Sequence, residues 1–222
     1  MRSNEDFSEL LWVEGKDDEA VVVGLCAAHM LPRGAFAIVP KGGVEKVLSG
    51  LPVQLRAPAV KRFGIVVDAN GSSSSRWEAI RGTLLREGYA DVPEALPTDG
   101  LVIPAAGDLP IFGAWIMPDN RSPGAIEEFV AALVPAGDWL WKHADEVVHS
   151  IPAEHRRFPD SRRAKAHIRT WLSWQEQPGS PMGQAIGKRD LDAHAPAALR
   201  FVDWLRRLMI SDEGAREGAE ED

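Results

Sequence analysis

Cysteine, tyrosine and long apolar runs are all scarce in this sequence of 222 residues. The single cysteine, Cys26, excludes an internal disulfide and gives no indication of a zinc site. No run approaches the roughly 18 apolar residues of a membrane-spanning helix, and the N-terminus MRSNEDFSE lacks the apolar core of a signal peptide. We therefore expect a cytoplasmic protein that does not act on a membrane.

Positive charge is in the minority, because 25 Lys and Arg residues stand against 33 Asp and Glu residues, for a net charge of −8 and a pI of about 5.3. This balance argues against a generally basic surface for nucleic acid. It leaves a local nucleic-acid site open, because metal ions supply positive charge where carboxylates cluster. The acidic segment 211–222, SDEGAREGAEED, has no apolar periodicity and is expected to be a disordered tail.

The first half of the chain alternates short apolar runs with helical patterns. The runs expected as strands are 10–14, 35–40 and 62–70, and the intervening helices are 17–31, 42–51 and 72–89. Continuous apolar strands that alternate with helices are typical of a parallel sheet covered on both faces. We expect an α/β fold with the strands in the order 10–14, 35–39, 62–68.

The second half departs from this alternation. Residues 100–120 contain two strand-like runs separated by Gly, Asp and Pro, which predicts a hairpin at one edge of the sheet. A helix is expected over 122–135 with Ser122 as its cap, followed by helices at 137–149, 160–175 and 195–209. We therefore divide the chain into an α/β domain at 8–135 and a helical C-terminal extension at 136–210 that packs on it.

Oxygen-bearing side chains gather where the strands end. Glu14 and Asp68 each end an apolar run, and a nearly buried carboxylate is costly unless it is paired or bound to metal. In open parallel sheets, ligands lie beyond the carboxyl ends of the strands. Further candidates at this edge are Asp17, Asp18, Asn70, Asp119, Asn120, Glu127 and Glu128. Acids in a first helical turn also favour the helix dipole, so Asp17 and Asp18 are open to a purely structural interpretation as helix-start residues.

These motifs carry a resemblance. VEGKDD after a strand and IVVDAN about fifty residues later resemble the Toprim domain of topoisomerases, primases and OLD (overcoming lysogenization defect) nucleases. The wider pattern, VEGKDD, VVDAN, WIMPDNRSPGAIEEF and AKAHIRTWLSWQEQPGSPMGQAI, is similar to small stand-alone bacterial Toprim proteins related to the OLD nucleases. The likeness covers residues 8–190 and implies a Toprim or Rossmann-like sheet with a helical C-terminal third.

The resemblance assigns roles to particular residues. Glu14 corresponds to the hallmark glutamate, and Asp18 is similar to the second acid on the first helix of OLD nucleases. Asp68 corresponds to the first acid of the family's DxD motif, whereas Asn70 replaces the second and lowers the charge. Glu127, in IEEF, resembles the acid of a third family motif.

A basic segment follows the acids. Arg162, Lys165 and Arg169 have the spacing of one helical face, which fits either phosphate binding or a solvated surface. OLD nucleases use a lysine C-terminal to their acids, and the resemblance makes Lys165 the candidate here. The glycine turn KGG at 41–43 lies near a strand end, but it lacks the spacing of a P-loop.

The expected activity is Mg²⁺- or Mn²⁺-dependent nicking or cleavage of DNA or RNA. The catalytic residues would be Glu14, Asp68 and Lys165, and the metal ligands Glu14, Asp18, Asp68, Asn70, Asp119 and Glu127. The first alternative is a non-catalytic module that binds metal or a partner and works with a separate ATPase, since the chain has no Walker A motif. A topoisomerase would need a tyrosine near the acids, and Tyr89 lies at a helix end. A receiver-like domain would need a lysine where IMPDNRSP stands, and a haloacid-dehalogenase-like phosphatase would need DxDx(T/V) where LLWVEGKDD stands.

Overall fold

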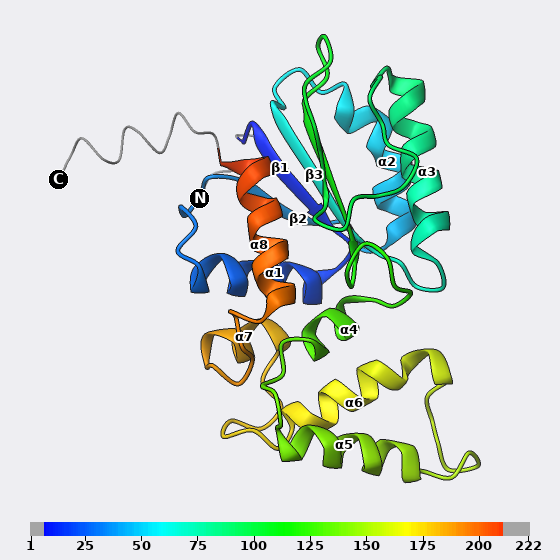
Figure 1. Ribbon diagram of the computed structural model, residues 1–222, viewed down its shortest axis with the longest axis vertical. Helices are drawn as coiled ribbons and strands as arrows, with labels where there is room; N and C mark the ends of the chain where they lie inside the picture. Colours follow the sequence, from blue (N-terminus) through cyan, green and yellow to red (C-terminus); the bar gives the residue numbers. More distant parts are fainter. Residues whose placement is uncertain (1–6, 211–222) are drawn as a thin grey trace, which may run out of the picture.

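A five-stranded, mostly parallel sheet forms the centre of the protein, as a computed structural model of the chain shows (Figure 1). The structure describes residues 7–210, so the predicted tail at 211–222 lies outside the described residues. The strands are β1 (Glu9–Val13), β2 (Ala37–Pro40), β3 (Arg62–Asp68), β4 (Leu101–Ile103) and β5 (Ile111–Met117). The first helices are α1 (Lys16–Ala28), α2 (Val44–Leu55), α3 (Ser73–Glu87) and α4 (Ile126–Ala131). The others are α5 (Trp139–Ser150), the 3₁₀ turn η2 (Asp160–Arg162), α6 (Arg163–Leu172), α7 (Met182–Gly187) and α8 (Pro196–Met209).

The strands lie in the order β2-β1-β3-β5-β4, which corrects the expected order. Strand β1 lies between β2 and β3, and both neighbours run parallel to it. Helices α1 and α2 cover opposite faces of the sheet, so the chain passes back over β1 before it adds β3. The apolar pattern could not distinguish the two orders, because all three strands are similarly apolar and β1 and β3 are almost wholly buried. A switch point, where the order reverses, therefore lies between β1 and β3.

Helices cover both faces of the sheet, as predicted. One apolar layer joins α1 and α8 to the sheet, and the other joins α2 and α3 to the opposite face. The hairpin at 100–120 is confirmed, because β4 pairs antiparallel with β5 and forms one edge of the sheet. No helix among residues 7–210 is long and apolar enough to cross a membrane.

Helix α8 returns from the helical C-terminal third to the sheet. Gly64 and Gly113 leave room for it, since a Cβ at either position would lie within 2.7 Å of Leu208 Cδ2. The indole of Trp204 donates to the carbonyl of Leu101 at 2.8 Å, and Arg62 donates to the carbonyl of Leu208 at 2.8 Å. Both contacts satisfy backbone oxygens at the helix–sheet boundary, so α8 is fixed to the sheet through polar and apolar contacts together.

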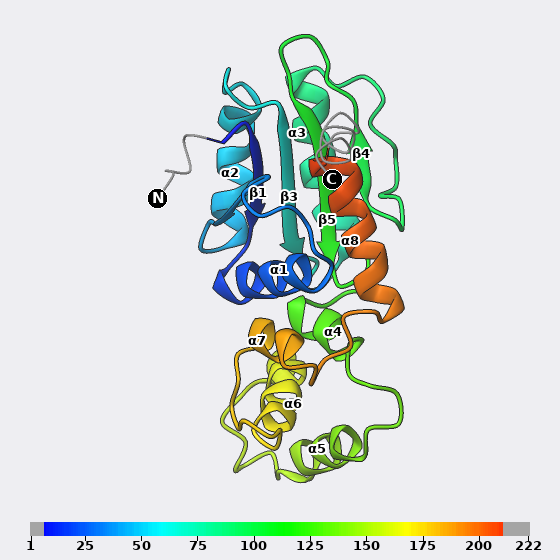
Figure 2. The same ribbon diagram turned by 90° about the vertical axis from the view of Figure 1, so that its left-hand side faces the viewer.

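Helices α5 and α6 form a pair beyond the carboxyl ends of the parallel strands (Figures 1 and 2). Trp141 of α5 stacks on His167 of α6 with ring centroids 3.5 Å apart, and Trp171 is fully buried between the helices and α4. The expected helix 160–175 is divided, because residues 160–162 form the turn η2 before α6 begins. This pair lies opposite the edge at which the sequence predicts a site.

Candidate functional site at the carboxyl edge of the sheet

Glu14 directly follows β1 and Asp68 is the last residue of β3, the two strands that flank the switch point. The carboxylate of Glu14 accepts a hydrogen bond from the Asp68 backbone N–H, with Oε2 3.1 Å from the nitrogen. The two residues are 54 positions apart, so the parallel pairing of β1 and β3 is what brings them together. Ligands of open parallel sheets bind at such a switch point.

The glycine turn predicted near the first strands holds the backbone of Glu14. The N–H groups of Gly42 and Gly43 both donate to the Glu14 carbonyl oxygen at 2.9 Å. Gly42 and Gly43 have φ of 77° and 125°, a region in which a residue with a Cβ is strained. The KGG sequence therefore positions the predicted catalytic acid, a role that its spacing alone did not indicate.

The two carboxylate oxygens of Asp18 have different surroundings, and one fits a structural role at the start of α1 while the other fits a metal ligand. Oδ2 accepts the Gly15 N–H at 3.0 Å and helps to begin the helix. Oδ1 is buried and has no hydrogen-bond partner, although the side chain is only 4% exposed. A buried carboxylate oxygen without a partner is costly in free energy, so this atom is one that a cation would stabilise.

The start of α4 brings in the third motif. Its first N–H, from Ile126, donates to Asp68 Oδ1 at 3.1 Å, so the helix begins against the acid of β3. Glu128 caps the same helix by accepting the Ala125 N–H at 2.8 Å, and it is therefore structural. Glu127 is 7% exposed, and its Oε1 lies 2.8 Å from the ammonium nitrogen of Lys165 on α6. The predicted acid and the predicted lysine are thus in direct contact.

Burial and mutual repulsion perturb the acids. Burial is the main cause that raises the pKa of Asp18 to about 7, and the nearby carboxylates of Glu14 and Glu127 raise it further. Burial also raises the pKa of Asp68 to about 8, with added repulsion from Asp18, Glu14 and Glu127. These interactions place the four carboxylates, which we call the acid cluster, within reach of one another's charge.

The raised pKa values predict that the metal-free protein loses stability as the pH rises from about 4 to about 8. The unfolded chain releases these protons near the ordinary aspartate pKa of about 3.9, whereas the folded protein keeps them to about pH 7–8. The folded state thus binds more protons across this window, and its free energy of unfolding falls as pH increases. Thermal melts with EDTA and with Mg²⁺ should show a cation-induced rise in Tm that grows from pH 5 to pH 8. An equal rise at both pH values would contradict this prediction.

Asn70 and Asp119, both predicted as metal ligands, lie outside the acid cluster. Asn70 is exposed at the rim, with φ of 51°, and its backbone pairs with Gly124 through hydrogen bonds of 2.7 and 2.8 Å. Asn tolerates this left-handed conformation, which gives it a local structural reason. Asp119 is a correction, because its carboxylate closes a turn by accepting from Arg121 and Ser122 and is not among the residues that line the site.

The turn at Asp119 also explains a second correction. Helix α4 begins at Ile126 with Ala125 as its N-cap, not at Ser122, because the Ser122 hydroxyl donates to Asp119 Oδ2 at 2.9 Å. Partial burial acts to raise the pKa of Asp119, but these hydrogen bonds and the charge of Arg200 outweigh it and hold the pKa below its usual value. A carboxylate satisfied in this way has no oxygen positioned for the acid cluster.

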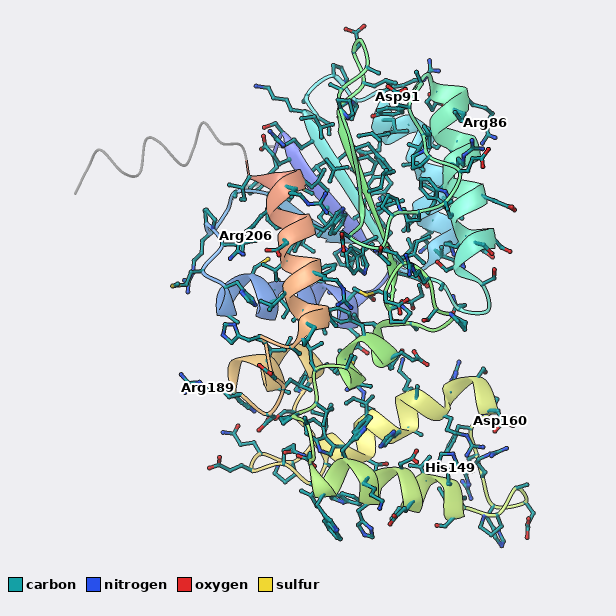
Figure 3. All side chains as sticks on the ribbon, in the orientation of Figure 1. Arg86, Asp91, His149, Asp160, Arg189 and Arg206 are labelled. Atoms are coloured by element: carbon teal, nitrogen blue, oxygen red, sulfur yellow. The ribbon has the colours of Figure 1, made fainter. Side chains whose placement is uncertain are left out.

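A cleft of about 860 Å³ separates the sheet edge from η2 and α6. Acids line one wall, and three basic residues from η2 and α6 line the other. The acidic wall contains Glu14, Asp68, Glu127 and Glu128, and the basic wall contains Arg162, Arg163 and Lys165. Asp160, labelled in Figure 3, marks the end of the helical pair that borders this cleft.

Arg162, Lys165 and Arg169, which were predicted to share one basic face, have three different surroundings. Arg162 is exposed in η2, whereas Lys165 contacts Glu127. Arg169 pairs with Asp17 at 2.7 Å and thereby ties α6 to α1, so this predicted phosphate contact is an interhelical bridge. Sequence reasoning also missed Arg76, whose Nε donates to the Asp68 carbonyl at 3.0 Å.

The acid cluster suits a hard divalent cation. Within residues 7–210, no three acidic, histidine or cysteine side chains are assembled in a ready metal-binding geometry. The donors near the switch point are nevertheless all oxygens, which Mg²⁺ and Mn²⁺ prefer. Asp18 Oδ1 is buried without a hydrogen-bond partner, and Glu127 Oε1 is buried with only the Lys165 ammonium beside it, so a metal ion would stabilise both oxygens. On these observations the residues fit the ion that the sequence resemblance implies.

The fold and site define an α/β protein of Rossmann-like type with an acidic cleft at the switch point of its sheet. The family described as "Protein of unknown function (DUF3226)" matches residues 8–210, and the chain belongs to that family. Comparison with curated proteins and with solved structures finds no match.

Proposed function

We propose that this protein is a Toprim-type enzyme, related to OLD nucleases, that nicks or cleaves DNA or RNA with Mg²⁺ or Mn²⁺. The observation that carries the proposal is the convergence of Glu14, Asp18, Asp68 and Glu127 at the switch point, opposite Lys165. These carboxylates come from four separate elements. The burial of Asp18 Oδ1 without a hydrogen-bond partner is costly for the fold alone.

The four carboxylates would hold the cation, with Asn70 at the rim as an additional oxygen. When bound, the ion supplies Lewis-acid stabilisation of the attacking and leaving oxygens of a phosphodiester. Lys165 is half-exposed on the opposite wall and donates to a non-bridging oxygen, where negative charge develops during the displacement. Arg162, exposed beside it, binds a neighbouring phosphate and fixes the strand in the cleft.

A tyrosine nucleophile does not fit this chemistry. The single tyrosine, Tyr89, is buried, and its hydroxyl donates to the Pro110 carbonyl at 2.7 Å. Burial raises the pKa of this phenol further above its ordinary value. Hydrolysis by water is therefore the reaction that we propose.

Plasmid nicking tests the proposal directly. Wild type should convert supercoiled DNA to open circles faster in Mn²⁺ than in Mg²⁺, and not in EDTA, and RNA should be assayed in parallel. Glu14→Ala should be inactive, because it removes the carboxylate that accepts from the Asp68 backbone, and Lys165→Ala should be slower than wild type. Equal cleavage by wild type and Glu14→Ala would refute the nuclease and leave the binding module. Activity that appears only with an added ATPase would identify one subunit of a two-component nuclease.

A second expected result concerns Asn70, which stands where the Toprim DxD motif has its second acid. Asn70→Asp should leave cleavage intact or raise it, and the gain should be larger in Mg²⁺, because an added rim charge favours the harder ion. Asp also tolerates the left-handed backbone at this position. Asp119→Asn is the control and should keep the wild-type ratio of Mg²⁺ to Mn²⁺ rates, since Asp119 caps a turn. A fall in rate for Asn70→Asp would contradict the assignment.

A further inference from the structure

The ammonium of Lys165 lies on the oxygen of Glu127 that a cation would need. The nitrogen is 2.8 Å from Oε1, yet that oxygen has no hydrogen bond, so the contact is one of charge rather than of good hydrogen-bond geometry. The lysine side chain is 49% exposed and the glutamate side chain is 9% exposed. The half-exposed ammonium group of Lys165 therefore reaches from α6 across the cleft to the buried carboxylate of Glu127.

Lys165 is also the one cation paired with the acid cluster. Among residues 7–210, it makes the only ion pair to any of Glu14, Asp18, Asp68 and Glu127. The neighbouring Arg163 is paired with Asp160, and Arg169 with Asp17, so the other cations of this helix have partners outside the cluster. Like charges held together in a partly buried site repel one another unless a counter-ion is near.

We propose that Lys165 is the counter-ion of the metal-free cleft and competes with the divalent cation for Glu127. The inference rests on the proposed function and adds an order of events to it. When the cation binds, the ammonium leaves Glu127 and becomes available to the substrate phosphate on the open side of the cleft. Loading of the cation and binding of nucleic acid are thereby coupled, and the coupling is reciprocal.

Competition gives Lys165 effects of opposite sign on binding and on cleavage. Removing the ammonium of Lys165 frees Glu127 Oε1, so the divalent metal ion should bind more tightly. Cleavage should be slower, because the substrate phosphate loses the hydrogen-bond donor that Lys165 supplies. A lysine that only supports the fold, or only helps to assemble the site, would lower both quantities. The sign of the change in cation affinity is therefore the informative measurement.

Calorimetric titration with Mn²⁺ tests this for wild type, Lys165→Met, Lys165→Gln and Arg162→Met. Both Lys165 variants should bind Mn²⁺ about three- to fivefold more tightly, the upper part of the range expected when a half-exposed ion pair no longer competes. Arg162→Met is the matched control, because it removes a cation from the same wall without touching Glu127. Its affinity should stay within about twofold of wild type, the range expected of a screened, exposed charge. The variants should keep the fold, since the side chains of Arg162 and Lys165 are exposed.

The outcomes separate the two proposals. Affinities of the Lys165 variants equal to or below wild type would overturn the competition but leave the metal site standing. Equal tightening in the Lys165 variants and in Arg162→Met would also overturn it, because the general field of the wall would then explain the effect. Absence of Mn²⁺ binding in wild type would overturn the metal-dependent function and this inference with it.

Discussion

Asp68→Asn is expected to slow cleavage strongly and, in the absence of metal, to make the protein more stable. Asn keeps the oxygen that accepts the Ile126 N–H, so the start of α4 is preserved. The substitution removes one of four mutually repelling charges, whose burial and repulsion raise the pKa of Asp68 to about 8. We expect a gain of about 1 kcal/mol in the free energy of unfolding at pH 8, the usual size of a single-residue effect.

Cleavage should fall by roughly 100-fold or more, because the lost charge is one that acts on the transition state. Urea unfolding with EDTA and plasmid nicking with Mn²⁺ measure the two effects on the same protein. Asp91→Asn is the matched control, because Asp91 is exposed at the end of the molecule opposite Asp160 and the cleft (Figure 3). It should change neither quantity. Loss of stability in Asp68→Asn would show that the carboxylate serves the fold and would count against the site.

The acids could be found from the sequence because they interrupt apolar strands. A carboxylate at the end of a buried run, such as Glu14 or Asp68, has no benefit for packing, and parallel pairing brings strand ends to one edge. The same logic failed for Asp119, which also follows an apolar strand. Its neighbours Arg121 and Ser122 supply hydrogen bonds to its carboxylate. Hydrogen bonds within a turn can occupy both oxygens of a carboxylate, and the position of the acid after a strand does not reveal this.

The order of the strands and the role of the glycine turn could not be predicted from the sequence. Equally apolar strands carry no mark of their neighbours, so the place of β1 between β2 and β3 depends on which face each helix covers. The KGG turn could be recognised as a turn, but its function of holding the Glu14 carbonyl depends on that same adjacency. Long-range geometry of this kind follows from tertiary packing and not from local propensity.

The contact between α1 and α7 is another long-range feature, and it depends on two glycines. A Cβ on Gly183 would lie 2.1 Å from the carbonyl oxygen of Ala20 and 2.3 Å from its carbon. A Cβ on Gly24 would lie 2.6 Å from the carbonyl oxygen of Gly183. The helices therefore pack backbone against backbone, and neither side can give way by rotating a side chain.

Gly183→Ala is accordingly expected to destabilise the protein by about 3 kcal/mol, the upper part of the range for overpacking. Gly187→Ala is the matched control in the same helix, because its Cβ would meet nothing within 4 Å. That variant should be neutral or gain about 0.5 kcal/mol, as alanine is favoured over glycine in a helix. Urea unfolding compares the two, and equal midpoints would show that α7 does not support α1. Mn²⁺ affinity should also fall in Gly183→Ala alone, since Ala20 is two residues from Asp18 and a displaced α1 moves that carboxylate away from the switch point.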